Sequence, residues 1–191
     1  MGRPAAFVRL CGCIEPCCPW CDTAYARERG RSMDLPVILE KVAALGKDLV
    51  VITGGEPFMQ WKTGLAELET RLLESGYRVQ YETSGKAGIP DSVKGHVVCS
   101  PKFLEQRWCF DTQYVSRVDD FKFVVVDDCE HVSNFVRTHN IPSQKVWIMP
   151  LGATRNEQLA RLADTWNFCE THNFNFTPRL HTLAFNNKRG V

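Results

Sequence analysis

The chain has 191 residues, of which 44% are hydrophobic and 24% are charged, an ordinary composition for a folded globular protein. Its formal net charge is +1, so charge gives no reason to expect a nucleic acid or a membrane surface as a partner. We expect a single domain over residues 1–191 and a cytoplasmic location, because no apolar run reaches the length of a membrane span and no secretion signal opens the sequence.

Short apolar runs alternate with helical patterns along the chain. The predicted strands are Phe7–Leu10, Asp48–Thr53, Tyr77–Glu82, His96–Cys99, Phe121–Val126, Lys145–Met149 and Arg179–Phe185. The predicted helices are Leu35–Leu45, Leu65–Leu73, Cys129–His139 and Asn156–Glu170. Apolar strands separated by helices indicate a parallel sheet with helices outside it. The predicted fold class is therefore α/β, a partial (β/α) barrel of about six mostly parallel strands.

Polar motifs follow these strands. They are Cys11–Thr23, Gly54–Pro57, Thr83–Gly85, Ser100–Lys102 and Pro150–Gly152. The carboxyl ends of parallel strands meet at one edge of the sheet, and such folds build their sites there. We therefore expect these loops to form the functional site.

The unusual feature of the composition is nine cysteines, five of which lie between Cys11 and Cys21. Thiols this close in sequence cannot all form unstrained disulfides, and clustered cysteines in a reducing compartment more often hold a metal. Three thiolates from one loop would leave one iron of a cubane cluster open to a small molecule, whereas a structural zinc site would use four thiolates in a closed shell. The cysteines by themselves leave both possibilities open.

The segment G54-G-E-P57 directly follows a predicted strand. Its glycine pair would let the backbone come close to a ligand, and Glu56 could accept a hydrogen bond from an ammonium group. A segment of this kind, one strand and one helix after a cysteine triplet, resembles the one that radical S-adenosylmethionine enzymes combine with an open iron–sulfur cluster.

Taken together, these motifs resemble the 7-carboxy-7-deazaguanine synthase family of radical S-adenosylmethionine (SAM) enzymes. The matching segments are G2-R-P-A-A-F-V-R-L10, C18-P-W-C-D-T23, T53-G-G-E-P57, E82-T-S-G85, S100-P-K102 and R179-L-H181. The resemblance implies a partial barrel of the radical SAM type and a carbon–nitrogen lyase. Such an enzyme contracts the ring of 6-carboxy-5,6,7,8-tetrahydropterin to give 7-carboxy-7-deazaguanine, with loss of ammonia, in queuosine and deazapurine biosynthesis.

The resemblance also implies roles for individual residues. The cluster ligands would be Cys13, Cys18 and Cys21, with Cys17 and Cys11 as spare candidates, and Thr23 would bind Mg²⁺. The residues around SAM would be Trp20, Asp22, Gly55, Glu56, Ser84, Ser100, Lys102, Met149, Pro150, Leu151 and Gly152. The substrate would meet Arg9, Thr53, His181 and Val191, with the Arg9 guanidinium on its carboxylate. The cofactors would be a [4Fe-4S] cluster, SAM and Mg²⁺, and the partners an electron donor such as a flavodoxin and a second copy of the chain.

Two features depart from the family pattern. The usual spacing of the radical SAM superfamily, C-x3-C-x2-C, would place a thiolate at position 14, which is Ile14. The expected register is therefore the longer C-x4-C-x2-C from Cys13, an expanded spacing of a kind that occurs in this family. The family also has a strand and a QGEG segment before the GxPAxF stretch, which this sequence lacks, so we expect the domain to be without its usual N-terminal strand.

Other interpretations stay open. The chain could be an activase of a glycyl-radical enzyme, which acts on a partner protein, or a zinc or iron–sulfur module without enzymatic activity. Individual residues also have simpler explanations: Arg9 could form a surface ion pair, Thr23 could cap the next segment, Lys102 could be solvated and His181 could be a buried histidine on a strand.

Overall fold

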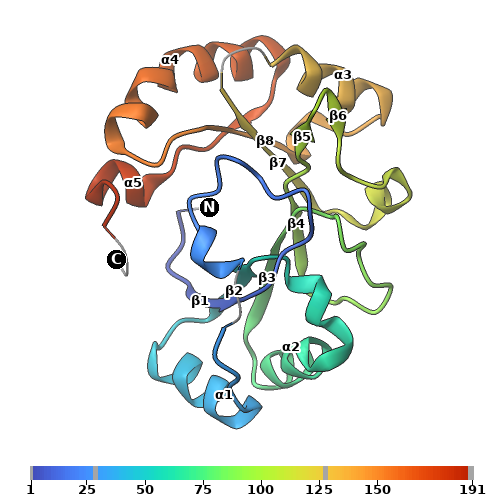
Figure 1. Cartoon of the computed structure of the whole chain (residues 1–191), viewed down its shortest axis with the longest axis vertical. Coiled ribbons are helices and arrows are strands. Elements are labelled where there is room, and N and C mark those ends of the chain that lie inside the picture. Colours follow the sequence, from blue (N-terminus) through green and yellow to red (C-terminus); the bar gives the residue numbers. More distant parts are fainter. Residues whose placement is uncertain (1, 28–29, 127–128, 189–191) are drawn as a thin grey trace. The chain divides into compact units, whose positions relative to one another are not determined.

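The computed structural model describes residues 2–27, 30–126 and 129–188 (Figure 1). They fall into two compact units, one spanning Arg3–Asp119 and the other running from Asp120 onward, together with Gly2. Each unit has its own set of parallel strands. None of the helices within those three ranges is long and apolar enough to cross a membrane.

The described residues of the first unit form four parallel strands in the order β1-β2-β3-β4. Their bounds are β1 (Ala6–Leu10), β2 (Leu49–Gly54), β3 (Arg78–Thr83) and β4 (His96–Cys99). Val50, Val51 and Ile52 of β2 are at most 5% exposed although successive side chains point to opposite faces of the sheet. The strand is therefore covered on both faces, which explains why it is a continuous apolar run.

Helices cover the strands of this unit (Figure 1). They are α1 (Leu35–Ala44), α2 (Leu65–Glu74) and the short 3-10 turns η1 (Ala24–Ala26), η2 (Pro57–Thr63) and η3 (Thr112–Arg117). The pair β5 (Phe103–Leu104) and β6 (Arg107–Trp108) adds a small antiparallel hairpin. Gly46 and Gly76, which follow α1 and α2, have φ of 59° and 82°, the left-handed conformation in which many helices end.

The second unit also has parallel strands, in the order β7-β8-β9. Its elements are β7 (Asp120–Val125), α3 (Glu130–Thr138), η4 (Ser143–Lys145), β8 (Val146–Pro150), α4 (Arg155–His172), β9 (Asn175–Phe176) and α5 (Leu180–Phe185). Helix α4 begins with a capping box, in which Thr154 accepts from the Glu157 amide and Glu157 accepts from the Thr154 amide. Seven parallel strands are thus described, against about six expected.

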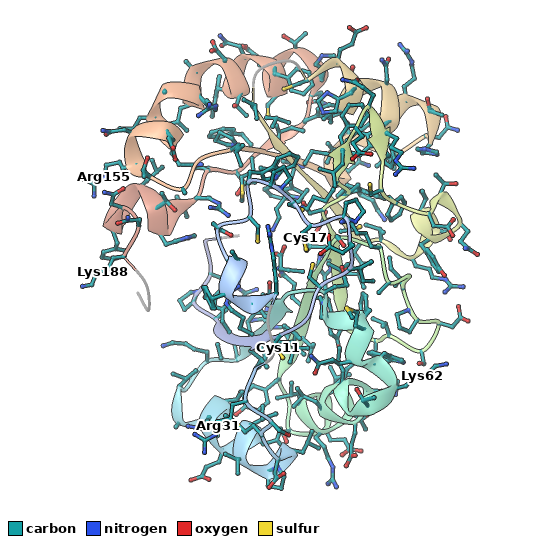
Figure 2. The ribbon with its side chains drawn as sticks, viewed as in Figure 1. Cys11, Cys17, Arg31, Lys62, Arg155 and Lys188 are labelled. Atoms are coloured by element: carbon teal, nitrogen blue, oxygen red, sulfur yellow. The ribbon has the colours of Figure 1, made fainter. Side chains whose placement is uncertain are left out.

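One predicted element is wrong. Arg179–Phe185 was expected as the last strand, but Leu180–Phe185 forms helix α5, and the last strand is β9, which the sequence analysis missed. The chain leaves the sheet at Thr177, whose amide donates to the Ile148 carbonyl, and Pro178, which has no amide hydrogen, cannot extend the pairing. Arg155 then donates from its guanidinium to the carbonyls of Leu183 and Ala184 at the end of α5 (Figure 2).

Candidate functional site

Four predicted loops of the first unit begin at matched levels of its sheet. In the parallel register, Leu10 of β1 lies opposite Gly54 of β2, and Thr83 of β3 lies opposite Cys99 of β4. The cysteine loop, the Ser84 turn and the SPK segment start at the residue after their strands, and the GGEP segment starts at Gly54 itself, the last residue of β2. All four therefore leave the same edge of the sheet. The edge predicted from the sequence is therefore present in this unit.

The glycine pair of GGEP lies directly against the cysteine loop. A Cβ on Gly55 would stand 1.6 Å from the carbonyl oxygen of Gly12, and one on Gly54, where φ is 135°, would stand 2.0 Å from that of Leu10. The Gly55 amide donates to the Leu10 carbonyl at 3.0 Å, and the Glu56 amide donates to the Gly12 carbonyl at 2.7 Å. The sequence analysis expected these glycines to admit a ligand; the structure shows that they admit the backbone of the cysteine loop.

The Glu56 carboxylate is 1% exposed and joins the GGEP segment to the end of β3. Its Oε1 accepts from the Thr83 hydroxyl at 2.5 Å and the Phe58 amide at 3.4 Å. Its Oε2 accepts from the Ser84 amide at 2.9 Å and the Ser84 hydroxyl at 2.5 Å. A buried carboxylate is costly unless it is well hydrogen-bonded, and these donors meet that need. Glu56 therefore fixes the position of Ser84, a second residue expected near SAM.

The cysteine loop is held to its surroundings mainly through main-chain atoms. Gln60 donates to the Cys11 carbonyl at 2.8 Å, the Gly12 amide donates to the Ala26 carbonyl at 2.9 Å, and the Arg27 guanidinium donates to the Cys18 carbonyl. None of these three bonds uses a thiol group. Figure 2 shows Cys11 and Cys17 on this loop, with its side chains drawn as sticks.

The five thiols differ in their surroundings. Cys17 donates from its thiol to Glu15 at 3.3 Å, and burial together with this hydrogen bond raises the pKa of Cys17 to about 11. Burial also raises the pKa of Cys18, while the positive charges of Lys102 and Lys86 act in the opposite direction. A thiol that binds iron must be deprotonated, so Cys18 has the better surroundings of the two neighbours.

The donor set fits an iron–sulfur cluster in its chemistry. Cys13, Cys18 and Cys21 are soft ligands, all partly buried on one loop, and the charges of Cys13 and Cys21 both influence Cys18. Among the described residues, however, no group of three His, Cys, Asp or Glu side chains is gathered closely enough to hold a metal ion.

Three residues expected to serve different ligands are hydrogen-bonded to one another: Asp22 and Thr23, at the end of the cysteine loop, and Arg9, in β1. The Thr23 hydroxyl donates to Oδ1 of Asp22 at 2.8 Å and accepts from Nη1 of Arg9 at 3.5 Å. Within the described part of the chain, Thr23 precedes η1 but its side chain makes no capping hydrogen bond there, so the simpler explanation of a helix cap does not apply. Together these three side chains provide a carboxylate, a hydroxyl and a guanidinium. Such groups are suited to a hard cation and a carboxylate substrate.

The SPK segment provides a charged group beside the same edge. Lys102 donates from Nζ to the Ser100 hydroxyl at 2.6 Å, and the Ser100 amide donates to the Thr83 carbonyl at 2.7 Å. Ser100 is 7% exposed, so Lys102 is attached to a buried residue rather than simply solvated. Trp20, in the cysteine loop, is 37% exposed, and Thr53 is partly buried at the end of β2.

Two basic residues in this unit were not identified from the sequence. Lys86 donates from Nζ to the carbonyls of Ile14 and Pro16, and Arg27 donates to the carbonyl of Cys18. Lys86 directly follows the E82-T-S-G85 motif, so its position next to a matched segment was a usable signal. Nothing in the sequence pattern marked Arg27 or its contact with the cysteine loop.

The loop after β8 belongs to the second unit and is described within it. Gln158 is fully buried and donates from Nε2 to the carbonyls of Pro150 and Gly152 at 2.7 and 3.2 Å. Its Oε1 accepts from the Arg179 amide at 3.0 Å, and the Arg179 guanidinium also donates to Gly152. One buried side chain therefore shapes the segment expected near the adenosine of SAM.

The C-terminal substrate residues fare differently. His181 was considered as a residue on a strand, but it lies on helix α5 and is exposed, so the alternative of a buried strand histidine is wrong. His181 lies on a helix and not on a strand because the sheet already ends at β9. Val191 lies outside the described residues.

Comparisons with known proteins identify the family. The model of the radical SAM superfamily matches residues 9–94, which include the cysteine loop and GGEP. The 7-carboxy-7-deazaguanine synthase of Pyrobaculum aerophilum is 38% identical over 202 residues, covering 100% of this chain and 90% of the relative. That of Hyperthermus butylicus is 35% identical over 209 residues, covering 96% of this chain and 85% of the relative.

The fold agrees as well. The crystal structure of QueE from Escherichia coli is similar with a TM-score of 0.73 at 23% identity, covering 93% of this chain and 86% of that one. This likeness confirms the predicted α/β fold class, and the match to the radical SAM superfamily supports its type. The identity, length and spread of the sequence matches together show that the chain belongs to the 7-carboxy-7-deazaguanine synthase family of radical SAM enzymes.

Proposed function

We propose that this enzyme is a carbon–nitrogen lyase that converts 6-carboxy-5,6,7,8-tetrahydropterin into 7-carboxy-7-deazaguanine with loss of ammonia, in queuosine and deazapurine biosynthesis. The observation that carries the proposal is the attachment of the cysteine loop to the GGEP segment through the Gly12–Glu56 and Leu10–Gly55 hydrogen bonds. Relatives that share this sequence over nearly their whole length bear the name of that synthase.

Cys13, Cys18 and Cys21 are the proposed ligands of a [4Fe-4S] cluster that leaves one iron for SAM. Once bound, the cofactors would supply radical chemistry, and the protein would hold, orient and shield the reacting groups. The loop contributes to that work because its backbone is tied to GGEP, Gln60 and Arg27. A ligand loop fixed in this way loses less conformational freedom when the cluster binds.

SAM is proposed to lie along the sheet edge beside Ser84, Ser100 and Lys102. Glu56 holds the Ser84 amide and hydroxyl, so its contribution includes positioning that residue as well as offering negative charge to an ammonium group. Lys102, which donates to Ser100, offers positive charge to a carboxylate. The other proposed contacts are Trp20, Asp22, Gly55, Met149, Pro150, Leu151 and Gly152.

The pterin and Mg²⁺ are both proposed to bind at the three side chains Arg9, Asp22 and Thr23. The Thr23 hydroxyl is an oxygen ligand of the kind Mg²⁺ prefers, and the Arg9 guanidinium can take the pterin carboxylate with paired hydrogen bonds. Contacts among these side chains already bring Arg9 and Thr23 together at 3.5 Å. Thr53, His181 and Val191 complete the proposed substrate set.

Several wider features belong to the same proposal. The enzyme acts in the cytoplasm as one domain, takes electrons from a donor such as a flavodoxin and forms a homodimer. The homodimer and the donor are proposed by analogy with the family alone. An activase of a glycyl-radical enzyme or a closed zinc module would be distinguished by the experiment below.

The test is anaerobic reconstitution with iron and sulfide, followed by incubation with the pterin, SAM, Mg²⁺ and dithionite. We expect about four iron atoms per chain and a product with the mass and absorbance of 7-carboxy-7-deazaguanine. Cys21→Ala should lose the cluster and all turnover, whereas Cys109→Ala, a partly buried thiol outside the loop, should keep both. Cleavage of SAM without deazapurine would indicate an activase, and a saturated zinc site that does not bind SAM would indicate a structural module.

A further inference from the structure

The cysteine loop offers two possible partners for Cys13. Cys17 and Cys18 are adjacent, so the chain could present either C-x3-C-x3-C or C-x4-C-x2-C to a cluster. The two thiols are both partly buried, and burial alone does not separate them. Something in the spacer between Cys13 and Cys18 must decide which thiol is available.

Glu15 engages Cys17 at two atoms. Its Oε2 accepts from the Cys17 amide at 2.7 Å, and its Oε1 accepts from the Cys17 thiol at 3.3 Å. The carboxylate therefore turns back along the spacer and holds both the main chain and the sulfur of Cys17. A thiol that donates to a carboxylate would have to give up that hydrogen bond before it could bind iron.

Lys86, in the turn after β3, holds the same spacer. Its ammonium group donates to the Ile14 carbonyl at 3.4 Å and to the Pro16 carbonyl. These residues lie 72 and 70 positions before Lys86 in the sequence. Its own amide donates to the Ser84 hydroxyl at 3.3 Å, and that hydroxyl donates to the buried Glu56. Lys86 is thus connected through Ser84 to the buried Glu56 carboxylate.

A second cation acts on the far side of Cys17. Arg27 donates to the Cys18 carbonyl, which follows the Cys17–Cys18 peptide bond. Lys86 donates to the Pro16 carbonyl, which precedes that bond. Both contacts use carbonyl oxygens and neither involves the sulfur of Cys18. Hydrogen bonds therefore restrain both the main chain and the thiol of Cys17, whereas the Arg27 contact restrains Cys18 through its backbone.

We propose that Glu15 and Lys86 are positioning residues that set the register of the cysteine loop, holding Cys17 away from the cluster and presenting Cys18. The inference rests on the cluster assignment in the proposed function. Lys86 also brings a positive charge to the loop, which favours the reduced, more negative cluster. Removing that charge should lower the reduction potential, an effect that a purely structural role would not produce.

The first test compares Cys17→Ser with Cys18→Ser in the full chain after anaerobic reconstitution. Cys17→Ser should retain iron and the electron paramagnetic resonance change caused by SAM, and Cys18→Ser should lose both. The inference is overturned if Cys18→Ser keeps the cluster while Cys17→Ser loses it.

The second test uses Lys86→Met, Lys86→Arg and the exposed control Lys62→Met (Figure 2). Lys86→Met should lower the cluster midpoint potential and increase the rate of cluster loss to a chelator several-fold. Lys86→Arg, which keeps the charge and the donors, should restore both values, and Lys62→Met should change neither. Circular dichroism checks that each variant is folded.

Glu15→Ala provides an independent measurement. Releasing Cys17 should allow it to compete with Cys18, so the Glu15→Ala, Cys18→Ser double variant should regain part of the iron that Cys18→Ser loses. Unchanged potentials and loss rates in Lys86→Met, with no iron regained in the double variant, would overturn the inference. These readouts do not depend on deazapurine formation, so failure of the proposed reaction would appear separately as an intact cluster without product.

Discussion

The Glu56 amide donates a 2.7 Å hydrogen bond to the Gly12 carbonyl, and through this contact the segment after β2 fixes the loop that carries the cysteines. The same residue uses its buried carboxylate to hold Thr83 and Ser84 at the end of β3. One residue therefore connects three adjacent loops, with its main chain toward one and its side chain toward the other.

Gly55→Ala should detach the cysteine loop. The new Cβ would stand 1.6 Å from the Gly12 carbonyl oxygen, and backbone cannot yield as a flexible side chain would. We expect destabilisation of about 3 kcal/mol, a typical upper cost of overpacking, and loss of most of the iron. Chemical denaturation and iron analysis measure the two effects.

Gly46→Ala is the matched control for this change. Gly46 has φ of 59°, and among the described residues no atom lies within 4 Å of its added Cβ, so it tests backbone strain without a clash. It should cost about 1 kcal/mol and leave the iron content unchanged. Equal iron content in both variants would contradict the docking role of Gly55.

Glu56→Gln should destabilise the protein because a carboxamide cannot satisfy the same donors. One of its two terminal atoms is an NH₂ group, which would face either the Ser84 amide or the Thr83 hydroxyl in place of an acceptor. We expect a loss of about 2–3 kcal/mol, the usual value for removing a charged acceptor from a buried donor. The exposed Glu67→Gln should stay within about 0.5 kcal/mol in the same urea titration.

Thr23→Val should impair catalysis without impairing the fold. The lost hydroxyl contacts Asp22 and Arg9, and in the described structure it does not cap η1, so stability and iron content should stay near normal. We expect kcat/KM for the pterin to fall about 10- to 100-fold, which corresponds to about 1.4–2.7 kcal/mol, with a weaker response to added Mg²⁺. Thr23→Ser, which keeps the hydroxyl, should recover most of the activity; equal kinetics of the Val and Ser variants would exclude the magnesium role.

How far the sequence could lead is clear from individual residues. The strand Asp48–Thr53 and the helix Leu65–Leu73 were predictable because burial and a closing glycine act locally, and the family motifs marked where the loops lie. By contrast, β9 was missed because Asn175 and Phe176 form too short a strand to show a period, and the pattern at Arg179–Phe185 reads equally as strand or helix.

The contacts that organise the site were less accessible. Lys86 reaches Ile14 and Pro16 across about a third of the chain, and no local pattern predicts a contact between residues so far apart. The Gly54–Gly55 pair was expected to let the backbone approach a ligand, whereas its neighbours in the structure are the backbone atoms of Leu10 and Gly12, which only the fold reveals. The cluster, SAM and substrate roles stay predictions for the experiments above.

Gln158→Leu should disturb the loop after β8 while sparing the cysteine loop. The substitution removes two donors to the Pro150 and Gly152 carbonyls and the acceptor of the Arg179 amide, all at a fully buried position. Each unpaired group costs about 1–3 kcal/mol, so we expect a total loss of about 3 kcal/mol after local relaxation. Weaker SAM binding with unchanged iron content would be the expected pattern, and Gln144→Leu, at an exposed glutamine, should alter neither.

The alkylation rate of Cys17 in the metal-free protein should depend on pH in a predictable way. Its pKa of about 11 lies above the ordinary value of 9.0, so the folded state favours the protonated thiol. At pH 9 an ordinary thiol is half ionised, whereas Cys17 is ionised to roughly one part in a hundred. Iodoacetamide is an electrophile that reacts with the thiolate and not with the thiol. Peptide mapping should therefore show Cys17 modified at least tenfold more slowly than a thiol in a short peptide.

The same pKa has a consequence for stability. The raised folded-state pKa means that the contribution of Cys17 is fully present below pH 9 and is lost as the pH rises through about 11, so the free energy of unfolding of the metal-free protein should fall across that window. Cys17→Ser, which has no group titrating there, should show a smaller decline. Glu15→Ala should speed the alkylation, because it removes a hydrogen bond that favours the thiol; an unchanged rate in that variant would show that burial alone protects Cys17.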